Sequence, residues 1–154
     1  MRARDLAEPY PTIALFDQLT TAADLLVSQQ LPALLVLDAE GHPVGVLRAE
    51  QLIAACLPRY FEQDPLLAQV IDERHADRLC VSSVRPVSDC FPPGRPRPFS
   101  VSPQCTLVQV AELMARTGSS VVAVTATAAD GTSRLVGAVT AARLLERLRQ
   151  VTPA

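Results

Sequence analysis

The sequence lacks tryptophan and lysine, and only 4% of its residues are aromatic. All fourteen basic residues are arginines, which we attribute to a compositional bias of the source genome. With a net charge of −2 and no basic stripe, nucleic-acid binding is not expected. The longest apolar runs, near 33–37 and 121–124, are too short to span a bilayer, and no signal-peptide core is present at the N-terminus. We therefore expect a cytoplasmic protein without membrane insertion.

Motifs of catalytic and metal sites are also missing. The sequence has no C-x-x-C or H-x-x-x-H spacing, no nucleophile elbow and no phosphate-cradling glycine loop. His75 lies among charged residues of a predicted solvent-facing helix, and His42 lies in a predicted turn. The cysteines fit buried free thiols (Cys56, Cys80, Cys90 and Cys105). These observations predict neither an enzyme nor a metal site.

The sequence does contain an internal duplication. Residues 12–37 align without a gap on residues 100–125, and residues 45–53 align on residues 137–145 after a four-residue insertion. The identical pairs are mostly apolar (Leu19/Leu107, Ala23/Ala111, Leu25/Leu113, Val36/Val124, Gly45/Gly137 and Leu52/Leu144). Two equivalent halves predict a pseudo-symmetric module with a binding cleft between them.

Each half has the pattern strand, helix, strand, strand, helix, which predicts a mixed α+β fold. Apolar residues follow the i, i+3, i+4, i+7 spacing of a helix from Leu19 and again from Leu107. Thr106 and Asp17 are the predicted N-caps of these two helices. The remaining elements are two strand pairs and two closing helices (33–37 with 44–47, 121–127 with 135–139, 49–57 and 141–150).

The two repeats are predicted to occupy residues 1–57 and 87–150, with residues 58–86 as a connector. Asp64 and Pro65 suit the start of a helix of about three turns within the connector. Residues 91–99 contain four prolines and are predicted to form a stiff, extended loop.

These features resemble the CBS domain pair, also called the Bateman module. The resemblance rests on the duplication, the order of elements, and a glycine that opens the third strand before a polar residue at the next helix start. It also includes two lead-in segments, residues 3–7 and 87–91. The resemblance implies a stand-alone, pseudo-twofold disc whose clefts bind AMP, ADP, ATP or S-adenosylmethionine. It further implies a regulatory homodimer that acts on a separate effector protein, such as an enzyme, a channel or a transporter.

The ligand motif of that family is G-h-x-T/S-x-x-D, in which a hydroxyl at a helix N-terminus can hold a phosphate or ribose oxygen. In the second repeat Thr140 matches the hydroxyl position and Arg143 stands in place of the aspartate. In the first repeat these positions are Arg48 and Gln51. The aspartate is missing from both copies, so neither cleft offers the carboxylate that accepts hydrogen bonds from a ribose diol in that family.

The resemblance implies ligand contacts in each cleft (Thr140, Arg143, Ser100, Val101 and Val122 in the second, Arg48, Gln51 and Thr12 in the first). Guanidinium groups favour phosphates. The second cleft is the better candidate because it keeps two hydroxyl residues. Alternatively, the arginines pair with neighbours such as Glu50 or Glu146, and the protein is a nucleotide-independent dimerisation or scaffolding protein with degenerate sites.

The closing helices of the two halves suggest a dimer for a separate reason. They carry more apolar surface than one small disc can bury (Leu52, Ile53, Leu144, Leu145 and Leu148). We therefore expect a homodimer that uses these helices.

Overall fold

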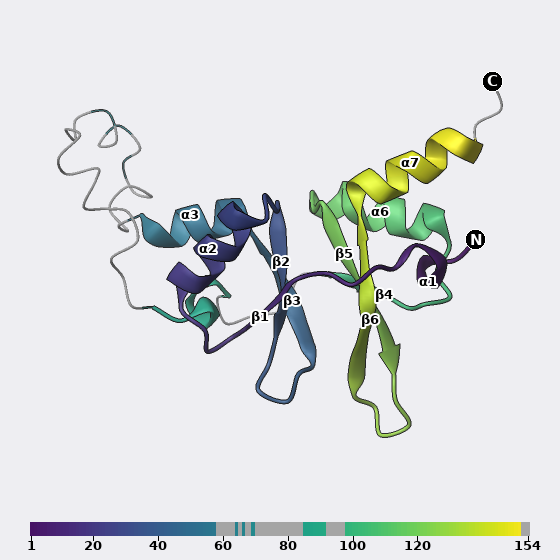
Figure 1. The fold of residues 1–154 in the computed structure, drawn as a ribbon, viewed down its shortest axis with the longest axis horizontal. Helices are drawn as coiled ribbons and strands as arrows, with labels where there is room; N and C mark the ends of the chain where they lie inside the picture. The colour runs from purple at the N-terminus through teal and green to yellow at the C-terminus, as the bar shows by residue number, and fades with distance from the viewer. Residues whose placement is uncertain (58–63, 65, 67–68, 70–84, 92–97, 152–154) are drawn as a thin grey trace.

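A computed structural model describes residues 1–57, 64, 66, 69, 85–91 and 98–151 of the chain (Figure 1). The first half contains α1 (Ala3–Leu6), β1 (Thr12–Ala14), α2 (Leu19–Ser28), β2 (Ala33–Leu37), β3 (Pro43–Arg48) and α3 (Ala49–Cys56). The second contains η2 (Val87–Cys90), β4 (Ser100–Val101), α6 (Leu107–Thr117), β5 (Val121–Thr127), β6 (Ser133–Thr140) and α7 (Ala141–Val151). The predicted element order and mixed α+β class are confirmed. The predicted connector helix and most of the proline-rich loop lie outside the described residues.

Each repeat forms a three-stranded sheet with the same topology. The first strand pairs in parallel with the second, and the second pairs antiparallel with the third, in the orders β1-β2-β3 and β4-β5-β6. The parallel pair is joined through α2 or α6, since parallel strands need a crossover connection. A register shift follows Val36 in one sheet and Val124 in the other, at equivalent positions of the duplication.

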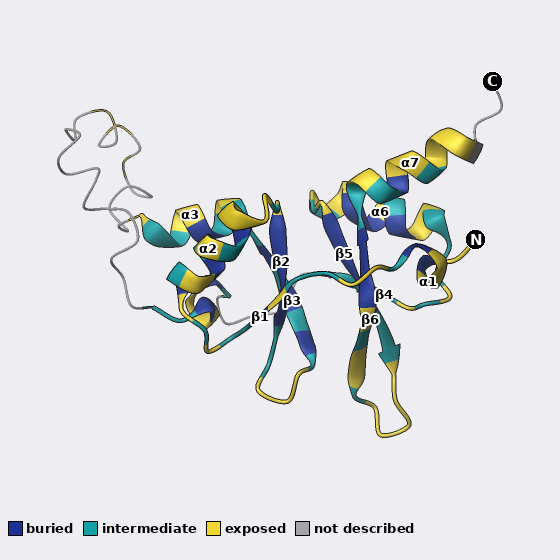
Figure 2. Ribbon diagram, viewed as in Figure 1, coloured by how far each residue is buried: buried dark blue, intermediate teal, exposed yellow. Residues whose placement is uncertain are grey.

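Strand alternation gives each sheet two apolar faces. One face packs beneath the helices of its own repeat, through Leu34, Val36 and Leu47 in the first and Val122, Val124 and Val139 in the second. The opposite faces pack against each other through a shared cluster of mainly small residues (Ala33, Leu35, Val121, Ala123 and Ala138). The central strands are consequently buried on both sides, as the dark blue of β2 and β5 shows (Figure 2).

The lead-in segments are exchanged between the repeats. Ala3 and Leu6 of α1 lie in the core of the second repeat, whereas Val87 and Cys90 of η2 lie in the core of the first. The backbone contacts are equivalent: the Ala3 N–H donates to the Cys105 carbonyl at 2.8 Å, and the Val87 N–H donates to the Asp17 carbonyl at 2.8 Å. The chain then crosses from α1 to β1 as an extended segment (Figure 1).

The two predicted N-caps have different outcomes. Thr106 caps α6, with its hydroxyl accepting from the Gln109 N–H at 3.3 Å and the Gln109 amide oxygen accepting from the Thr106 N–H at 2.8 Å. The prediction for Asp17 was wrong, because α2 begins after Gln18 and the Asp17 carboxylate instead accepts from the Ala14 N–H at 3.0 Å. Asp17 therefore stabilises the turn between β1 and α2.

Within the described part of the chain, no helix has the length and apolar character required to cross a membrane.

Candidate functional site

The third strand of each repeat runs directly into the closing helix at an equivalent point. Arg48 ends β3 and pairs with Ala33, and Thr140 ends β6 and pairs with Val121. The first backbone N–H of each helix is held in the same way, by the Pro32 carbonyl at 3.1 Å for α3 and by the Ser120 carbonyl at 2.8 Å for α7. The two ligand-motif positions therefore occupy equivalent helix N-termini.

Strand alternation places four predicted site residues on the faces through which the sheets meet. Val46 and Ala138 belong to the cluster between the sheets, and Arg48 and Thr140 each follow two residues later on the same strand. Thr12 and Ser100 alternate with Ile13 and Val101, which pack on the helix side. The structure thus brings these four polar residues to the inter-repeat side.

The two predicted apolar contacts lie on the other face of the second sheet. Val122 is 1% exposed and belongs to the core beneath the helices, against which Val101 also packs. Their side chains contribute to the stability of the repeat, and strand alternation turns them away from Ser100 and Thr140.

Thr140 combines a hydroxyl with a helix N-terminus. Its Oγ1 accepts from the Arg143 N–H at 3.3 Å, which leaves the hydroxyl proton available to a ligand oxygen. In α3 the equivalent bond is reversed: the Gln51 amide oxygen accepts from the Arg48 N–H at 2.8 Å. Gln51 therefore supports the start of α3, and its NH₂ group remains as a donor.

Arg143 is held by two carboxylates. Its Nε lies 3.3 Å from Oε1 of Glu8, and its Nη1 lies 3.7 Å from Oε2 of Glu146. The Nε atom is shielded from solvent, although its N–H is not aligned for a hydrogen bond with Glu8. Glu146 is the neighbour expected from the sequence. Glu8 was missed, because no local pattern reveals that residue 8 reaches the second repeat.

Arg48 has a different environment. Among the residues that the structure describes, its half-buried side chain has no ion-pair partner, and Glu50 in the first turn of α3 is exposed. The guanidinium of the first repeat is accordingly less neutralised by described carboxylates than that of the second.

The spacing of the polar residues suits an extended ligand. Ser100 pairs with Ala123 and Thr140 pairs with Val121, so the two hydroxyls are separated by one intervening strand and two residues along it. Strand spacing and rise place them about 10 Å apart across the sheet and about 7 Å along it. A single molecule that contacts both must therefore be larger than one phosphate group.

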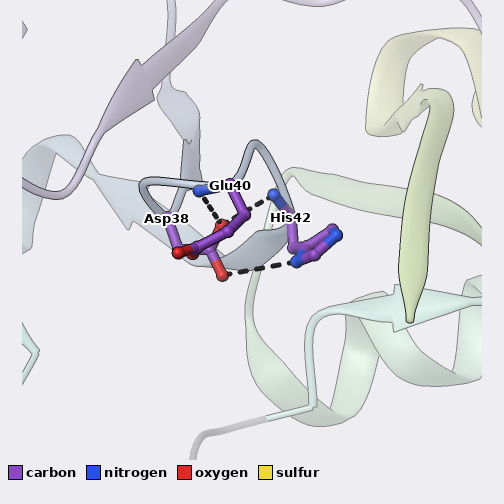
Figure 3. Close-up of side chains that lie close together, drawn as sticks. All are labelled: Asp38, Glu40 and His42. Atoms are coloured by element: carbon purple, nitrogen blue, oxygen red, sulfur yellow. Dashed lines mark hydrogen bonds and ion pairs between the residues drawn. The ribbon is translucent and has the colours of Figure 1, made fainter. Parts of the chain in front are cut away.

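A second group of titratable side chains lies at the turn between β2 and β3. Asp38, Glu40 and His42 gather there, with their ligand-type atoms within 4.8 Å of one another (Figure 3). Oδ1 of Asp38 accepts from the backbone N–H groups of Glu40 at 3.0 Å and His42 at 2.8 Å. The other hairpin uses Asp130 in a similar way, and hydrogen bonds from Thr132 lower the pKa of the Asp130 carboxyl. We assign both aspartates to turn formation.

Comparisons with known proteins agree with this arrangement. The CBS domain matches residues 3–58 and 87–150, and no curated protein sequence matches the chain. A CBS domain-containing protein from Kribbella flavida is 35% identical, with a TM-score of 0.74, and the alignment covers 97% of this chain and 99% of that one.

Two less similar structures share the fold and carry bound ligands. CBSX2 in complex with AMP is 22% identical, with a TM-score of 0.66 and 97% coverage of both chains. The CBS domain pair of protein MJ0100, in complex with 5′-methylthioadenosine and S-adenosyl-L-methionine, is 17% identical, with a TM-score of 0.65 and coverage of 99% and 98%. From its two matched segments, its paired sheets and its similarity to the Kribbella protein, the chain belongs to the CBS domain family and contains two CBS domains.

Proposed function

We propose that the protein is a regulatory module that binds an adenine nucleotide or a related adenosyl compound between its two repeats. The observation that carries the proposal is Thr140, whose hydroxyl stands at the N-terminus of α7 on the side that faces the first repeat. CBS proteins are typically regulatory rather than catalytic, and structures of similar fold bind AMP or S-adenosylmethionine.

Each helix start offers a different set of groups to such a ligand. The positive end of the helix dipole attracts phosphate or ribose oxygens. In the second repeat the Thr140 hydroxyl can donate to such an oxygen, with Ser100 on the same sheet face. In the first repeat Arg48 can bind a phosphate, and the Gln51 NH₂ group can donate to a ribose oxygen.

Ligand binding between two repeats provides a means of regulation. A ligand that contacts both sheets shifts the equilibrium between two arrangements of the repeats only when it binds one arrangement more tightly than the other. We propose that such a change is transmitted to a separate protein, an enzyme, channel or transporter.

The proposed dimer uses α3 and α7. Leu52 and Leu144 are 7% and 4% exposed and belong to the cores, so they are not available to a partner as the sequence suggested. Ile53 and Leu145, the next residues along, are 62% and 60% exposed and give each helix an exposed apolar side chain. The exposure of these two apolar side chains supports a homodimer in which a second copy covers them.

Thermal denaturation with ligands tests the function. AMP, ADP, ATP and S-adenosylmethionine at millimolar concentration are each added to the purified protein, and a bound ligand raises the melting temperature through linkage. Mass spectrometry of small molecules released on denaturation identifies any ligand that copurifies. No shift with any of the four compounds, together with no released adenine compound, would overturn the proposal.

A nucleotide-independent scaffold is the second candidate. It is favoured by the contacts of Arg143, whose guanidinium is already held by Glu8 and Glu146. Equilibrium dialysis against a nucleotide panel separates the two functions, because a scaffold retains its dimeric state and binds none of the compounds.

A further inference from the structure

The exchange of lead-in segments places Glu8 beside the second repeat. Its N–H donates to the Ala138 carbonyl at 2.9 Å, and the Ala138 N–H donates to the Glu8 carbonyl at 2.9 Å. These two bonds fix the backbone of residue 8 beside β6, two residues before Thr140. The Glu8 carboxylate is therefore positioned at the start of α7 by the fold and not by its own helix.

The carboxylate occupies the environment that an anionic ligand would need. Its Oε1 lies 3.3 Å from Nε of Arg143, in the first turn of α7, where the helix dipole also favours negative charge. Glu146 adds a second carboxylate, 3.7 Å from the same guanidinium. A phosphate placed at this helix start would have to displace Glu8 or lie beside two negative groups.

The first repeat lacks equivalents of both carboxylates. In the alignment of the lead-ins Glu8 corresponds to Pro92, and in the alignment of the closing helices Glu146 corresponds to Ala54. Pro92 lies outside the described residues, but its side chain has no charge. The helix start at Arg48 thus differs from that at Thr140 in the charges that the sequence places around it.

We propose that Glu8 determines ligand specificity, so that the second repeat selects an uncharged adenosyl compound and disfavours phosphorylated nucleotides. The first repeat, with Arg48, is then the site for phosphorylated ligands. This inference rests on the proposed function and adds the charge selectivity of each site. The side chains of Arg143 and Glu8 are 38% and 53% exposed, so solvent screens their attraction and the selectivity is modest, a few-fold in dissociation constant.

Calorimetric titration of the full chain with AMP and with adenosine tests the inference. Arg48→Gln serves as the background, so that phosphate binding at the first repeat does not hide the second. In this background Glu8→Gln is expected to tighten AMP binding about threefold or more relative to adenosine, because one of the two opposing carboxylates is removed. Glu112→Gln is the matched control, since Glu112 is an exposed carboxylate paired with Arg116 at 2.7 Å on α6.

The variant Arg143→Gln provides a test in the opposite direction. It removes the cation that pairs with Glu8 and Glu146, so binding of AMP is expected to weaken relative to binding of adenosine. It also serves if Glu8→Gln fails to fold. If neither substitution changes the ratio of the dissociation constants for AMP and adenosine, the proposed role of Glu8 in ligand selectivity is overturned. The proposed function is left intact by that result. Absence of binding of both compounds to the unsubstituted protein overturns the inference. The proposed function is overturned with it only if ADP, ATP and S-adenosylmethionine also fail to bind.

Discussion

A Cβ atom on Gly137 would lie 2.9 Å from the carbonyl oxygen of Glu8. Because that carbonyl accepts from the Ala138 N–H, the lead-in cannot move away without breaking the bridge to β6. At the equivalent Gly45 an added Cβ would lie closest to Cε1 of Phe91, at 2.8 Å, in a side chain that can rotate. Gly137, within β6, is thus required for the close approach of the Glu8 backbone, whereas at Gly45, within β3, the ring of Phe91 can move aside.

Gly137→Ala is therefore expected to destabilise the protein more than Gly45→Ala. We expect a loss of about 1–3 kcal/mol in the free energy of unfolding for Gly137→Ala, as for other insertions into packed regions. Denaturant unfolding of both variants measures the difference. Equal losses would show that the backbone of the Glu8 segment adjusts as easily as the ring of Phe91.

The helix caps give a pair of opposite predictions. Thr106→Ala removes the hydroxyl that accepts from the Gln109 N–H and should cost about 1 kcal/mol. Gln18, the N-cap of α2, makes no side-chain cap bond, so Gln18→Ser should increase stability by about 0.5–1 kcal/mol. Urea midpoints of the two variants check both signs. A destabilised Gln18→Ser variant would contradict the equivalence of these helix starts.

The buried phenol of Tyr10 should make the protein less stable at alkaline pH. Burial raises the pKa of the Tyr10 phenol above its usual value. The neutral hydroxyl donates a hydrogen bond to the Ala33 carbonyl at 2.7 Å, and this bond is lost when the phenol ionises. Tyr10 ionises at a lower pH in the unfolded chain than in the folded protein. Its contribution to the free energy of unfolding is therefore complete below about pH 10 and decreases as pH rises through the folded pKa.

Unfolding measured from pH 8 to pH 11 tests this prediction with Tyr10→Phe as the control. The variant lacks the ionisable group and should lose about 1 kcal/mol at pH 8 from the missing hydrogen bond, with a smaller further loss at high pH. Parallel pH profiles for the two proteins would exclude Tyr10 as the source of the alkaline loss.

Thr140 should contribute to ligand binding through its hydroxyl. Thr140→Ala removes the group that caps α7 and is expected to reduce the ligand-induced rise in melting temperature and to lower intrinsic stability by about 1 kcal/mol. Thr140→Ser keeps the hydroxyl and should preserve most of the rise. If serine and alanine reduce the rise equally, the hydroxyl is not the contact.

Ile53 and Leu145 should determine the dimer. Replacement of either by Glu places a charge in the proposed interface between α3 and α7 of two copies, and the dimer fraction should fall at micromolar concentration by sedimentation. Val136, 45% exposed on β6, provides a control position, and Val136→Glu should leave the dimer intact. If the unsubstituted protein is already monomeric at this concentration, the proposed homodimer is contradicted.

Local sequence patterns predicted most helices and strands because period and capping act over a few residues. Thr106 and Gln109 form the expected capping box, and β5 has its predicted bounds. The same patterns could not place Val122, whose apolar character suits either sheet face. Only pairing with β6 and packing against α6 and α7 assign it to the core.

The duplication alone established the two-repeat fold, since matching apolar positions in both halves require the same packing twice. Only the tertiary structure showed that α1 and η2 are exchanged between the repeats. A four-residue helix has too few contacts of its own to determine its location, and it docks where the opposite repeat offers a matching surface. That docking brings Glu8 to Arg143, 135 positions away in the sequence, and so sets the charge at the second helix start.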